Sequence, residues 1–178
     1  MAYKIILIGD PRVGKTSIRK KYMGEGFKGN YMVTLGADFA IKRLDKDVMQ
    51  IWDLAGQPVY QSVRSSYYGG AEGIILVFDI TSRETFYNCA KWLNEVVSNL
   101  DYLIPLILVG NKNDLRTNNN PDEINPQEGE NYAKELSKWS GFDVGYIETS
   151  ALTGMNVDNI FNLLKDEIDN SKSMQMGR

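Results

Sequence analysis

Histidine is absent from this chain of 178 residues, and cysteine occurs only once. Without histidine the protein has no Ser–His–Asp triad, no imidazole general base and no histidine-ligated metal. The single cysteine, Cys89, excludes an intramolecular disulfide and fits a reducing compartment. Its neighbours Phe86 and Leu93 are apolar, so we expect Cys89 to be a small buried group and not a nucleophile.

Long apolar runs and basic clusters are also missing. No apolar stretch approaches the roughly 18 residues of a membrane span, and the net charge of −3 argues against nucleic acid as the main partner. The sequence shows no signal peptide, Ala2 excludes N-myristoylation, and the last residues hold no prenylatable cysteine. We therefore expect a cytoplasmic protein that reaches a membrane only if a lipidated tail follows this sequence.

The clearest motif that is present is GDPRVGKT at residues 9–16, directly after the apolar run at residues 5–8. A glycine, four residues and then Gly-Lys-Thr is the spacing of a phosphate-binding P-loop. A strand that turns sharply into a helix directs backbone N–H groups and the partial positive charge of the helix N-terminus at one point. Lys15 would reach the β- and γ-phosphates of a nucleotide, and the Thr16 hydroxyl would ligate Mg²⁺.

Apolar runs and helical patterns alternate along the chain. Predicted strands lie at residues 5–8, 39–41, 48–52, 74–78, 106–109 and 144–147. Predicted helices begin at Thr16, at a capping box formed by residues 81–84, at Asn125 and at Asn156. The helix after the capping box would bury Phe86, Ala90, Leu93, Val97 and Leu100.

This alternation predicts an α/β fold with a doubly wound, mostly parallel, six-stranded sheet that has one antiparallel edge strand. We expect one domain over residues 1–170 and a short mobile tail at residues 171–178. In such sheets, ligands bind beyond the carboxyl ends of the strands. Polar residues should therefore gather just after the strands, and the sequence places them there.

Asp53, Gly56 and Gln57 follow the strand at residues 48–52. A carboxylate at a strand end opposite the P-loop can hold Mg²⁺ directly or through water. Gly56 allows the backbone to approach a γ-phosphate closely, and Gln57 suits the orientation of a water molecule because it both donates and accepts hydrogen bonds. Taken alone, this stretch fits an ordinary strand end equally well.

Residues 111–114 follow the fifth predicted strand, at 106–109, and residues 149–151 follow the sixth, at 144–147. The Asp114 carboxylate can accept hydrogen bonds from the N1–H and 2-amino groups of guanine, and adenine offers no such pair of donors. This motif therefore predicts selection of guanine over adenine. The Ala151 N–H is expected to donate to guanine O6, although a Thr-Ser-Ala tripeptide alone carries little information.

Taken together, these four stretches resemble the motifs of the Ras superfamily of small GTPases, and they are most similar to its Rab branch. Further Rab-like stretches are TLGADF at 34–39, IWDLAGQ at 51–57, SYYGGA at 66–71, FDIT at 78–81 and QEGE at 127–130. The resemblance covers residues 3–169. It implies a P-loop NTPase fold of the small G-domain type that binds GTP or GDP with Mg²⁺ and hydrolyses GTP to GDP and phosphate. It also implies a molecular switch whose loops are read by effectors, in membrane traffic or signalling.

The resemblance assigns further roles. Thr34 matches the residue whose hydroxyl completes Mg²⁺ coordination and whose N–H contacts the γ-phosphate. Phe27 matches the aromatic residue against the guanine, and the Lys112 stem would pack over the base. Phe39, Trp52 and Tyr67 match an aromatic trio that Rab proteins present to effectors, although Trp52 could equally be a partly buried core residue.

The predicted catalytic residues are Lys15, Thr34, Gly56 and Gln57, and the predicted metal ligands are Thr16, Thr34 and Asp53. The predicted nucleotide-binding residues are Asp10, Arg12, Val13, Gly14, Lys15, Thr16, Ser17, Phe27, Tyr31, Thr34, Gly56, Asn111, Lys112, Asp114, Leu115, Ser150, Ala151 and Leu152. The implied partners are effectors, a GTPase-activating protein and an exchange factor, which would bind residues 27–42 and 53–70 of a monomer.

Three residues depart from the family pattern. Pro11 would lie near the γ-phosphate, where a partner's arginine enters, so we expect it to alter sensitivity to an activating protein. Arg12 either supplies transition-state charge in cis or points to solvent or a nearby carboxylate. Pro58 restricts the loop that must position Gln57.

A P-loop kinase would need an Arg-rich lid and an acceptor site, and neither is visible in the sequence. A scaffold that holds GTP without hydrolysing it is opposed by Lys15, Thr34 and Gln57, although Pro58 keeps this alternative open.

Overall fold

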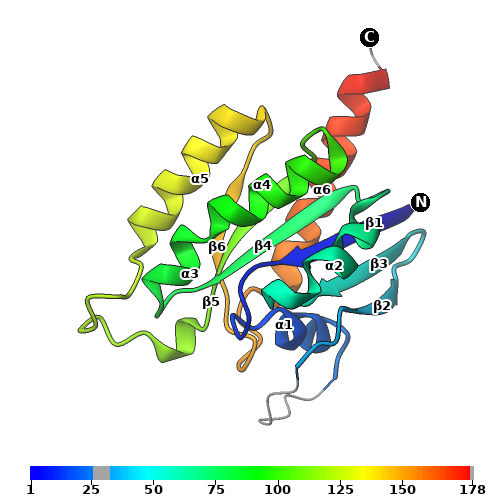
Figure 1. Cartoon of the computed structure of the whole chain (residues 1–178). Helices are drawn as coiled ribbons and strands as arrows, with labels where there is room; N and C mark the ends of the chain where they lie inside the picture. The colour runs from blue at the N-terminus through cyan, green and yellow to red at the C-terminus, as the bar shows by residue number, and fades with distance from the viewer. Residues whose placement is uncertain (26–32, 177–178) are drawn as a thin grey trace.

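The computed structural model describes residues 1–25 and 33–176 and forms one six-stranded sheet with helices on both faces (Figure 1). The strand order is β2-β3-β1-β4-β5-β6. Only β2 pairs antiparallel, with β3 at the edge, and the remaining pairs are parallel. The strands are β1 (Ala2–Ile8), β2 (Ala37–Arg43), β3 (Val48–Leu54), β4 (Gly73–Asp79), β5 (Leu106–Asn111) and β6 (Gly145–Glu148). The predicted doubly wound sheet is confirmed.

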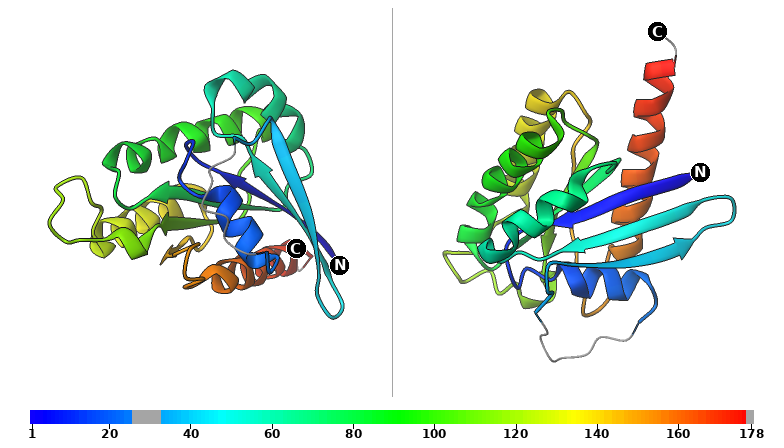
Figure 2. Two further views of the ribbon diagram at one scale, coloured as in Figure 1. Left: turned by 90° about the horizontal axis from the view of Figure 1, so that it is seen from below. Right: turned by 45° about the vertical axis from the view of Figure 1, so that its right-hand side comes forward.

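The helices cover the two faces of the sheet unequally (Figure 2). Helices α1 and α6 pack on one face, and α2 to α5 pack on the other. They are α1 (Lys15–Tyr22), α2 (Gln61–Tyr68), α3 (Arg83–Tyr87), α4 (Cys89–Leu100), α5 (Pro126–Ser140) and α6 (Val157–Met176). Two short 3₁₀ helices, η1 (Pro58–Tyr60) and η2 (Asn113–Leu115), follow β3 and β5.

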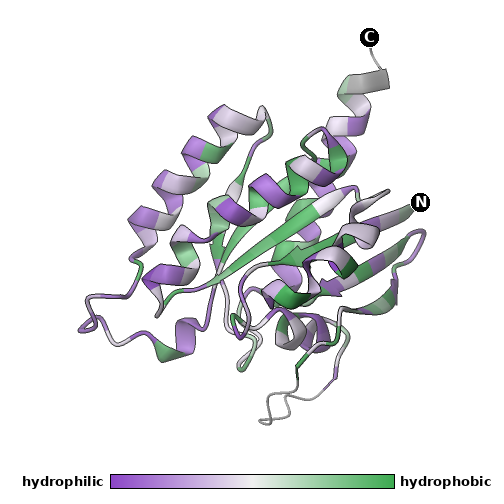
Figure 3. Cartoon of the chain, viewed as in Figure 1, coloured by the Kyte–Doolittle hydropathy of each residue, from purple (hydrophilic) through white to green (hydrophobic). Residues whose placement is uncertain are grey.

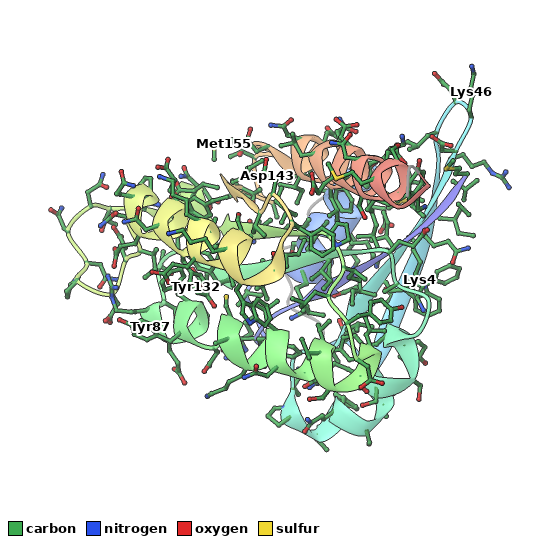
Figure 4. The ribbon with its side chains drawn as sticks, turned by 90° about the horizontal axis from the view of Figure 1, so that it is seen from above. Lys4, Lys46, Tyr87, Tyr132, Asp143 and Met155 are labelled. Carbon is green, nitrogen blue, oxygen red and sulfur yellow. The ribbon has the colours of Figure 1, made fainter. Side chains whose placement is uncertain are left out.

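The central strands form the core because they are buried on both faces. Every residue of β4 is buried, as expected for a parallel strand between two helical layers. In β1, Ile5 and Leu7 face the α1/α6 layer, whereas Ile6 and Ile8 face the other layer. Figure 3 shows this apolar centre, with the hydrophilic residues mainly on the outer helices and loops. The β2–β3 hairpin extends outward to Lys46 (Figure 4).

The prediction of a single helix opened by residues 81–84 is wrong, because the structure divides this helix at Asn88 into α3 and α4. The predicted capping box of Thr81 and Glu84 is also absent: the helix begins after Ser82, which makes no side-chain cap, and the Thr81 hydroxyl donates to the Asp79 carboxylate at 2.7 Å. The break shifts the register of the apolar face, so Ala90 is exposed and Val97 is only half-buried. The buried face of α4 consists of Cys89, Trp92, Leu93, Val96 and Leu100.

The other two predicted helix starts have different outcomes. At α5, Asn125 and Glu128 form a reciprocal capping box, as predicted. At α6, Asn156 does precede the helix, but its side-chain amide donates to the Glu148 carbonyl of β6 at 2.8 Å. Helix α6 then continues to Met176, so the segment expected to be a tail is helical over residues 171–176. Lys172 of this segment forms an ion pair with Glu72 at 2.5 Å.

Within the described ranges, no helix combines the length and apolar character that crossing a membrane requires.

Candidate functional site

The P-loop connects the end of β1 to the start of α1, and Asn111 at the end of β5 holds it in place. Gly14 adopts a φ of 102°, and a Cβ there would lie 2.2 Å from the Asn111 side-chain nitrogen. That nitrogen donates to the Val13 carbonyl at 2.8 Å. The residue before α1 is Gly14, which has no side chain that could cap the helix. The first N–H groups of α1 are therefore available to an anion.

Lys15 is buried inside the loop it follows. Its Nζ atom donates to the carbonyls of Gly9 at 2.7 Å and Asp10 at 2.8 Å. Burial lowers the Lys15 pKa to about 8, although the negative charges of Asp53 and Asp10 oppose this shift. The Lys15 ammonium group would bond more strongly to phosphate oxygens than to these two carbonyls, because hydrogen bonds between opposite charges are stronger than those to neutral acceptors.

Thr16, Thr34 and Asp53 converge from α1, from the loop before β2 and from β3. The hydroxyls of Thr16 and Thr34 lie 3.0 Å apart, and the Thr16 hydroxyl donates to an Asp53 carboxylate oxygen. The Thr34 hydroxyl is 3.4 Å from the same oxygen. The other Asp53 oxygen is buried and lacks a hydrogen-bond partner within the described ranges. Burial raises the Asp53 pKa, with Lys15 opposing this effect.

This donor set fits a hard divalent cation. Hydroxyl and carboxylate oxygens are the ligands that Mg²⁺ prefers, and a buried carboxylate oxygen without a partner is costly unless a cation or donor satisfies it. The three predicted metal ligands are therefore brought together at the carboxyl end of the sheet, beside Lys15.

Gly56 lies directly against the P-loop. A Cβ at Gly56 would be 2.4 Å from the Pro11 nitrogen and 2.6 Å from the Asp10 carbonyl carbon, so only glycine fits here. Gln57 is half-buried and extended, with φ −69° and ψ 137°. Proline imposes this conformation on the preceding residue, and Pro58 begins η1.

The guanine motifs meet at the ends of β5 and β6. Asp114 is exposed on η2, and one of its carboxylate oxygens accepts a hydrogen bond from the Ser150 hydroxyl at 2.5 Å. Lys112 adopts a positive φ of 71° and pairs with Asp79 at 2.5 Å. Leu115 and Leu152 are exposed beside them.

The Ala151 N–H, which is predicted to donate to guanine O6, donates in the structure to the Asn111 side-chain oxygen at 3.2 Å. Guanine O6 would therefore share this donor with Asn111. The Asn111 side chain also accepts from the Thr149 hydroxyl at 3.0 Å. Asn111 thus joins the P-loop to the 149–151 loop, and the local pattern could not indicate this bond because its partners are distant in sequence.

The remaining predicted site residues have varied positions. Ser17 is half-buried on α1, and Arg12 is exposed with φ 66°. Asp10 was predicted to contact nucleotide, but its carboxylate bonds to α4, accepting from Trp92 Nε1 at 2.8 Å and Asn88 at 2.7 Å. Only the Asp10 backbone therefore faces the loop interior. The predictions for Phe27 and Tyr31 lie outside the described residues.

Comparison with known proteins identifies the family. A family model described as the Ras family matches residues 4–170. The chain belongs to the Ras family. It is 37% identical over 182 residues to Ras-related protein SEC4 of Saccharomyces cerevisiae, covering 98% of this chain and 80% of SEC4. It is 39% identical over 173 residues to Ras-related protein RABA4b of Arabidopsis thaliana, covering 95% and 73% of the two chains.

A third relative is Ras-related protein Rab11D of Lotus japonicus, which is 39% identical over 163 residues, covering 89% of this chain and 71% of the relative. The chain is thus a Rab-like small GTPase of the Ras family, which binds GTP and GDP and hydrolyses GTP. The resemblance stated from its motifs is confirmed.

The Rab-like aromatic trio is assembled in space. The ring centroids of Phe39 and Trp52 lie 4.9 Å apart, and those of Trp52 and Tyr67 lie 5.1 Å apart. These residues come from β2, β3 and α2, so one continuous aromatic surface links the antiparallel edge strand to α2. Phe39 is 46% exposed, whereas Trp52 and Tyr67 are half-buried.

Sequence reasoning missed several polar residues that position this GTPase site. Glu148 accepts from the Asn113 side chain at 2.6 Å and pairs with Arg116 at 2.5 Å, which supports the Asn113–Leu115 turn. Arg64 on α2 is buried and pairs with Glu95 on α4 at 2.9 Å. The helical pattern of the sequence could have predicted that Trp92 is buried. A buried arginine has no comparable signal, because arginine is usually exposed.

Proposed function

We propose that this GTPase is a Mg²⁺-dependent molecular switch of Rab-type membrane traffic, with GTP hydrolysis controlling two loops around Thr34 and Gln57. The convergence of Thr16, Thr34 and Asp53 carries the proposal. Thr34 and Asp53 flank the hairpin strands, so a ligand that engages Thr34 also restrains the loop before β2. Relatives with Rab names support the traffic role.

Each residue of the site has a role in hydrolysis under this proposal. Thr16, Thr34 and Asp53 hold Mg²⁺, which when bound neutralises charge on the phosphate oxygens. Lys15 donates to the β- and γ-phosphates, and the Gly56 N–H donates to the γ-phosphate. Gln57 orients the water that attacks the γ-phosphorus, and the products are GDP and inorganic phosphate.

Guanine selection rests on Asp114 under the same proposal. Its exposed carboxylate would accept from the guanine N1–H and 2-amino groups, while Ser150 holds it in place at 2.5 Å. The stem of Lys112 would pack on the base, restrained by Asp79. A base without the two donors would leave the carboxylate unpaired in the closed site, which weakens its binding.

Partner recognition is proposed to follow the nucleotide state. Hydrolysis removes the γ-phosphate, and the restraint on Thr34 and Gly56 is lost, so effectors distinguish the two states. The aromatic trio of Phe39, Trp52 and Tyr67 lies beside both loops and is the proposed effector surface. Activating and exchange proteins would bind residues 27–42 and 53–70, of which residues 27–32 lie outside the described ranges. We propose a monomer.

Mg²⁺ dependence tests the proposal directly. GDP release from the natural protein should accelerate at least about tenfold when EDTA is added, because chelation removes the cation that Thr16, Thr34 and Asp53 would hold and with it the charge that would stabilise the bound phosphates. Asp53→Ala should release GDP rapidly with or without EDTA, whereas the matched variant Asp47→Ala, at the hairpin, should behave like the natural protein. If chelation changes neither GDP release nor GTP hydrolysis in the natural protein, the Mg²⁺ proposal is wrong.

Pro11 and Arg12 are proposed to tune hydrolysis. The Pro11 nitrogen lies where a Cβ on Gly56 would clash, so its ring is next to the proposed γ-phosphate contact. Pro11→Gly should therefore change the turnover obtained with an activating protein, and equal turnover would refute this. For Arg12, single-turnover hydrolysis by Arg12→Ala decides the role in cis, since an unchanged rate rejects it.

A further inference from the structure

Arg64 lies on α2, and its guanidinium reaches back to the loop that follows β3. Although residues 61–63 before it are exposed, Arg64 is only 2% exposed. Its Nη1 atom donates to the carbonyls of Ala55 and Gln57, both at 2.8 Å. These two carbonyls flank Gly56, so one side chain restrains the backbone on both sides of this glycine.

The hydrogen bond to Ala55 determines where the Gly56 N–H points. The Ala55 carbonyl and the Gly56 N–H belong to the same peptide unit, and the chain has no cis peptide bond within the described ranges. In a planar trans peptide these two groups point in opposite directions. Because the carbonyl points at Arg64 and α4, the Gly56 N–H points away from them. The Cα of Gly56 itself packs on the P-loop, since a Cβ at this position would meet Pro11 and Asp10.

The bond to Gln57 restrains the peptide unit between Gln57 and Pro58, two units further along the chain. The nitrogen of that unit belongs to Pro58, so it has no N–H group with which to anchor itself elsewhere. The Gln57 carbonyl also accepts from the Tyr60 N–H at 3.1 Å. The Gln57 main chain is therefore fixed through its carbonyl oxygen, by Arg64 and by η1.

The guanidinium is itself held on α4. Its Nε and Nη2 atoms form two bonds of 2.9 Å with the two carboxylate oxygens of Glu95. The Tyr68 hydroxyl donates to Glu95 at 2.8 Å, and the guanidinium carbon lies 4.6 Å from the Trp92 ring centroid. A bidentate pair stacked on an aromatic ring fixes the orientation of arginine in a way that lysine cannot reproduce.

Trp92 also fixes the P-loop. Its Nε1 atom donates to one oxygen of the Asp10 carboxylate at 2.8 Å, while the Asn88 amide donates to the other at 2.7 Å. One face of α4 thus holds the P-loop through Asp10 and the Gly56–Gln57 backbone through Arg64. The spacing between these two parts of the site is set by a single rigid helix.

We propose that Arg64 is a positioning residue for GTP hydrolysis: clamped on α4 by Glu95 and Trp92, it directs the Gly56 N–H toward the γ-phosphate and holds Gln57 in register with the P-loop. The inference rests on the roles proposed above for Gly56 and Gln57. Arg64 does not touch the nucleotide, and it acts through the two carbonyls. Its loss should therefore affect the GTP state and the chemical step more than GDP binding.

Two variants test this inference. Arg64→Lys keeps the charge but cannot bond both carbonyls and Glu95 together. The double variant Arg64→Met/Glu95→Leu replaces the buried pair with apolar groups, which often preserves stability. For both we expect single-turnover hydrolysis to slow about tenfold or more and the ratio of GTP to GDP affinity to fall several-fold. GDP affinity should stay within about twofold, because the affected contacts are to the γ-phosphate alone.

Arg83→Lys is the matched control. Arg83 also pairs with a glutamate, Glu128, at 2.7 Å, but this ion pair joins the start of α3 to α5. This variant should hydrolyse GTP at the natural rate. If either folded Arg64 variant hydrolyses GTP at the natural rate, or if GDP affinity falls in parallel with the rate, the positioning role is refuted.

Gln57→Ala separates this inference from the proposed function. If Gln57→Ala is slow while the Arg64 variants are normal, only the positioning role fails. If Gln57→Ala itself hydrolyses GTP at the natural rate, the proposed role of Gln57 fails. The Arg64 inference is then also refuted in its Gln57 part, and the affinity ratio alone decides the Gly56 part.

Discussion

The two ends of the sheet differ in whether their polar and charged side chains are buried or exposed. At the carboxyl end of the strands, polar side chains are buried: Lys15, Asp53, Asp79, Asn111, Thr149 and Ser150. At the amino end, where β1 begins and α6 ends (Figure 1), the charges form ion pairs near the surface. Examples are the Met1 ammonium with Asp47 at 2.6 Å and Lys165 with Asp169 at 2.9 Å.

This difference indicates which end serves binding. Burying a polar group costs free energy unless its bonds are satisfied, and Asp53 has a buried oxygen without a partner within the described ranges. Exposed ion pairs neither cost nor contribute much. Burial of polar groups at the carboxyl end therefore lowers the stability of the free protein, and a bound ligand can restore it by satisfying these groups. The exposed ion pairs of the amino end carry no such cost. Substitutions at the two ends should accordingly affect different measurements.

The largest effect is expected for Lys15→Ala. Removing a buried ammonium from the proposed phosphate contact should weaken GDP and GTP binding at least about 100-fold, as for other charge-assisted contacts in closed sites. The measurement is nucleotide affinity by titration calorimetry. Lys172→Ala, which removes a lysine of the amino end, should leave affinity unchanged. If Lys15→Ala binds nucleotide as tightly as the natural protein, the two ends do not differ in the way described.

The sequence predicted the position of the site because its main residues follow strands. Asp53 lies near the end of β3, and Thr16 and Asp114 lie on the helical segments that follow β1 and β5. The carboxyl ends of parallel strands meet at one edge of a sheet. Short-range pattern was enough for this. It was also enough for the Asn125 capping box, whose partners are three residues apart.

The polar framework behind the site could not be predicted in the same way. Arg64 is buried by Glu95 and Trp92, which belong to another helix. Asp10 turns its carboxylate to α4 for the same reason. The break at Asn88 was missed because the apolar pattern of residues 86–100 fits one continuous helix nearly as well. The contacts of Arg64 and Asp10 thus join residues far apart in the chain, whereas the break at Asn88 reflects a local pattern that fits two structures.

The next effect in size concerns base selection. Asp114→Ala should weaken GDP binding between about 10- and 100-fold, because a charged acceptor of two hydrogen bonds is lost. The natural protein should prefer GDP to inosine diphosphate, which lacks the 2-amino group, and Asp114→Ala should lose this preference. Competition binding with the two nucleotides measures it. An unchanged preference in the variant would show that Asp114 does not recognise the base, and Asp143→Ala is the control.

Asp79→Asn should have a smaller effect at the same end. Asp79 pairs with Lys112 at 2.5 Å and accepts from the Thr81 N–H and hydroxyl at 2.9 and 2.7 Å. Asparagine keeps the size and an acceptor for Thr81 but loses the ion pair that holds Lys112 beside the base site. We expect GDP dissociation to accelerate about three- to tenfold with little change in unfolding temperature. Natural dissociation kinetics would mean that Lys112 needs no support from Asp79.

The smallest effect is expected at the amino end, for Asp169→Asn. Asp169 accepts from the Tyr3 hydroxyl at 2.7 Å and from Lys165 at 2.9 Å. Burial alone would raise the Asp169 pKa, but the bonds to Lys165 and Tyr3 outweigh it, so the pKa is lowered. Because the carboxylate side chain is 37% exposed, the variant should lose only about 1 kcal/mol of unfolding free energy at pH 7.

The pH dependence of this loss follows from the lowered pKa. A carboxylate whose pKa is lower in the folded state stabilises the fold above its unfolded pKa, near 3.9, and this stabilisation disappears as pH falls through the folded value. Urea unfolding should therefore separate Asp169→Asn from the natural protein at pH 7, and the gap should narrow below about pH 4. GDP affinity should not change. A variant that lost nucleotide affinity while keeping its stability would contradict the contrast between the two ends, because the amino end would then contribute to binding.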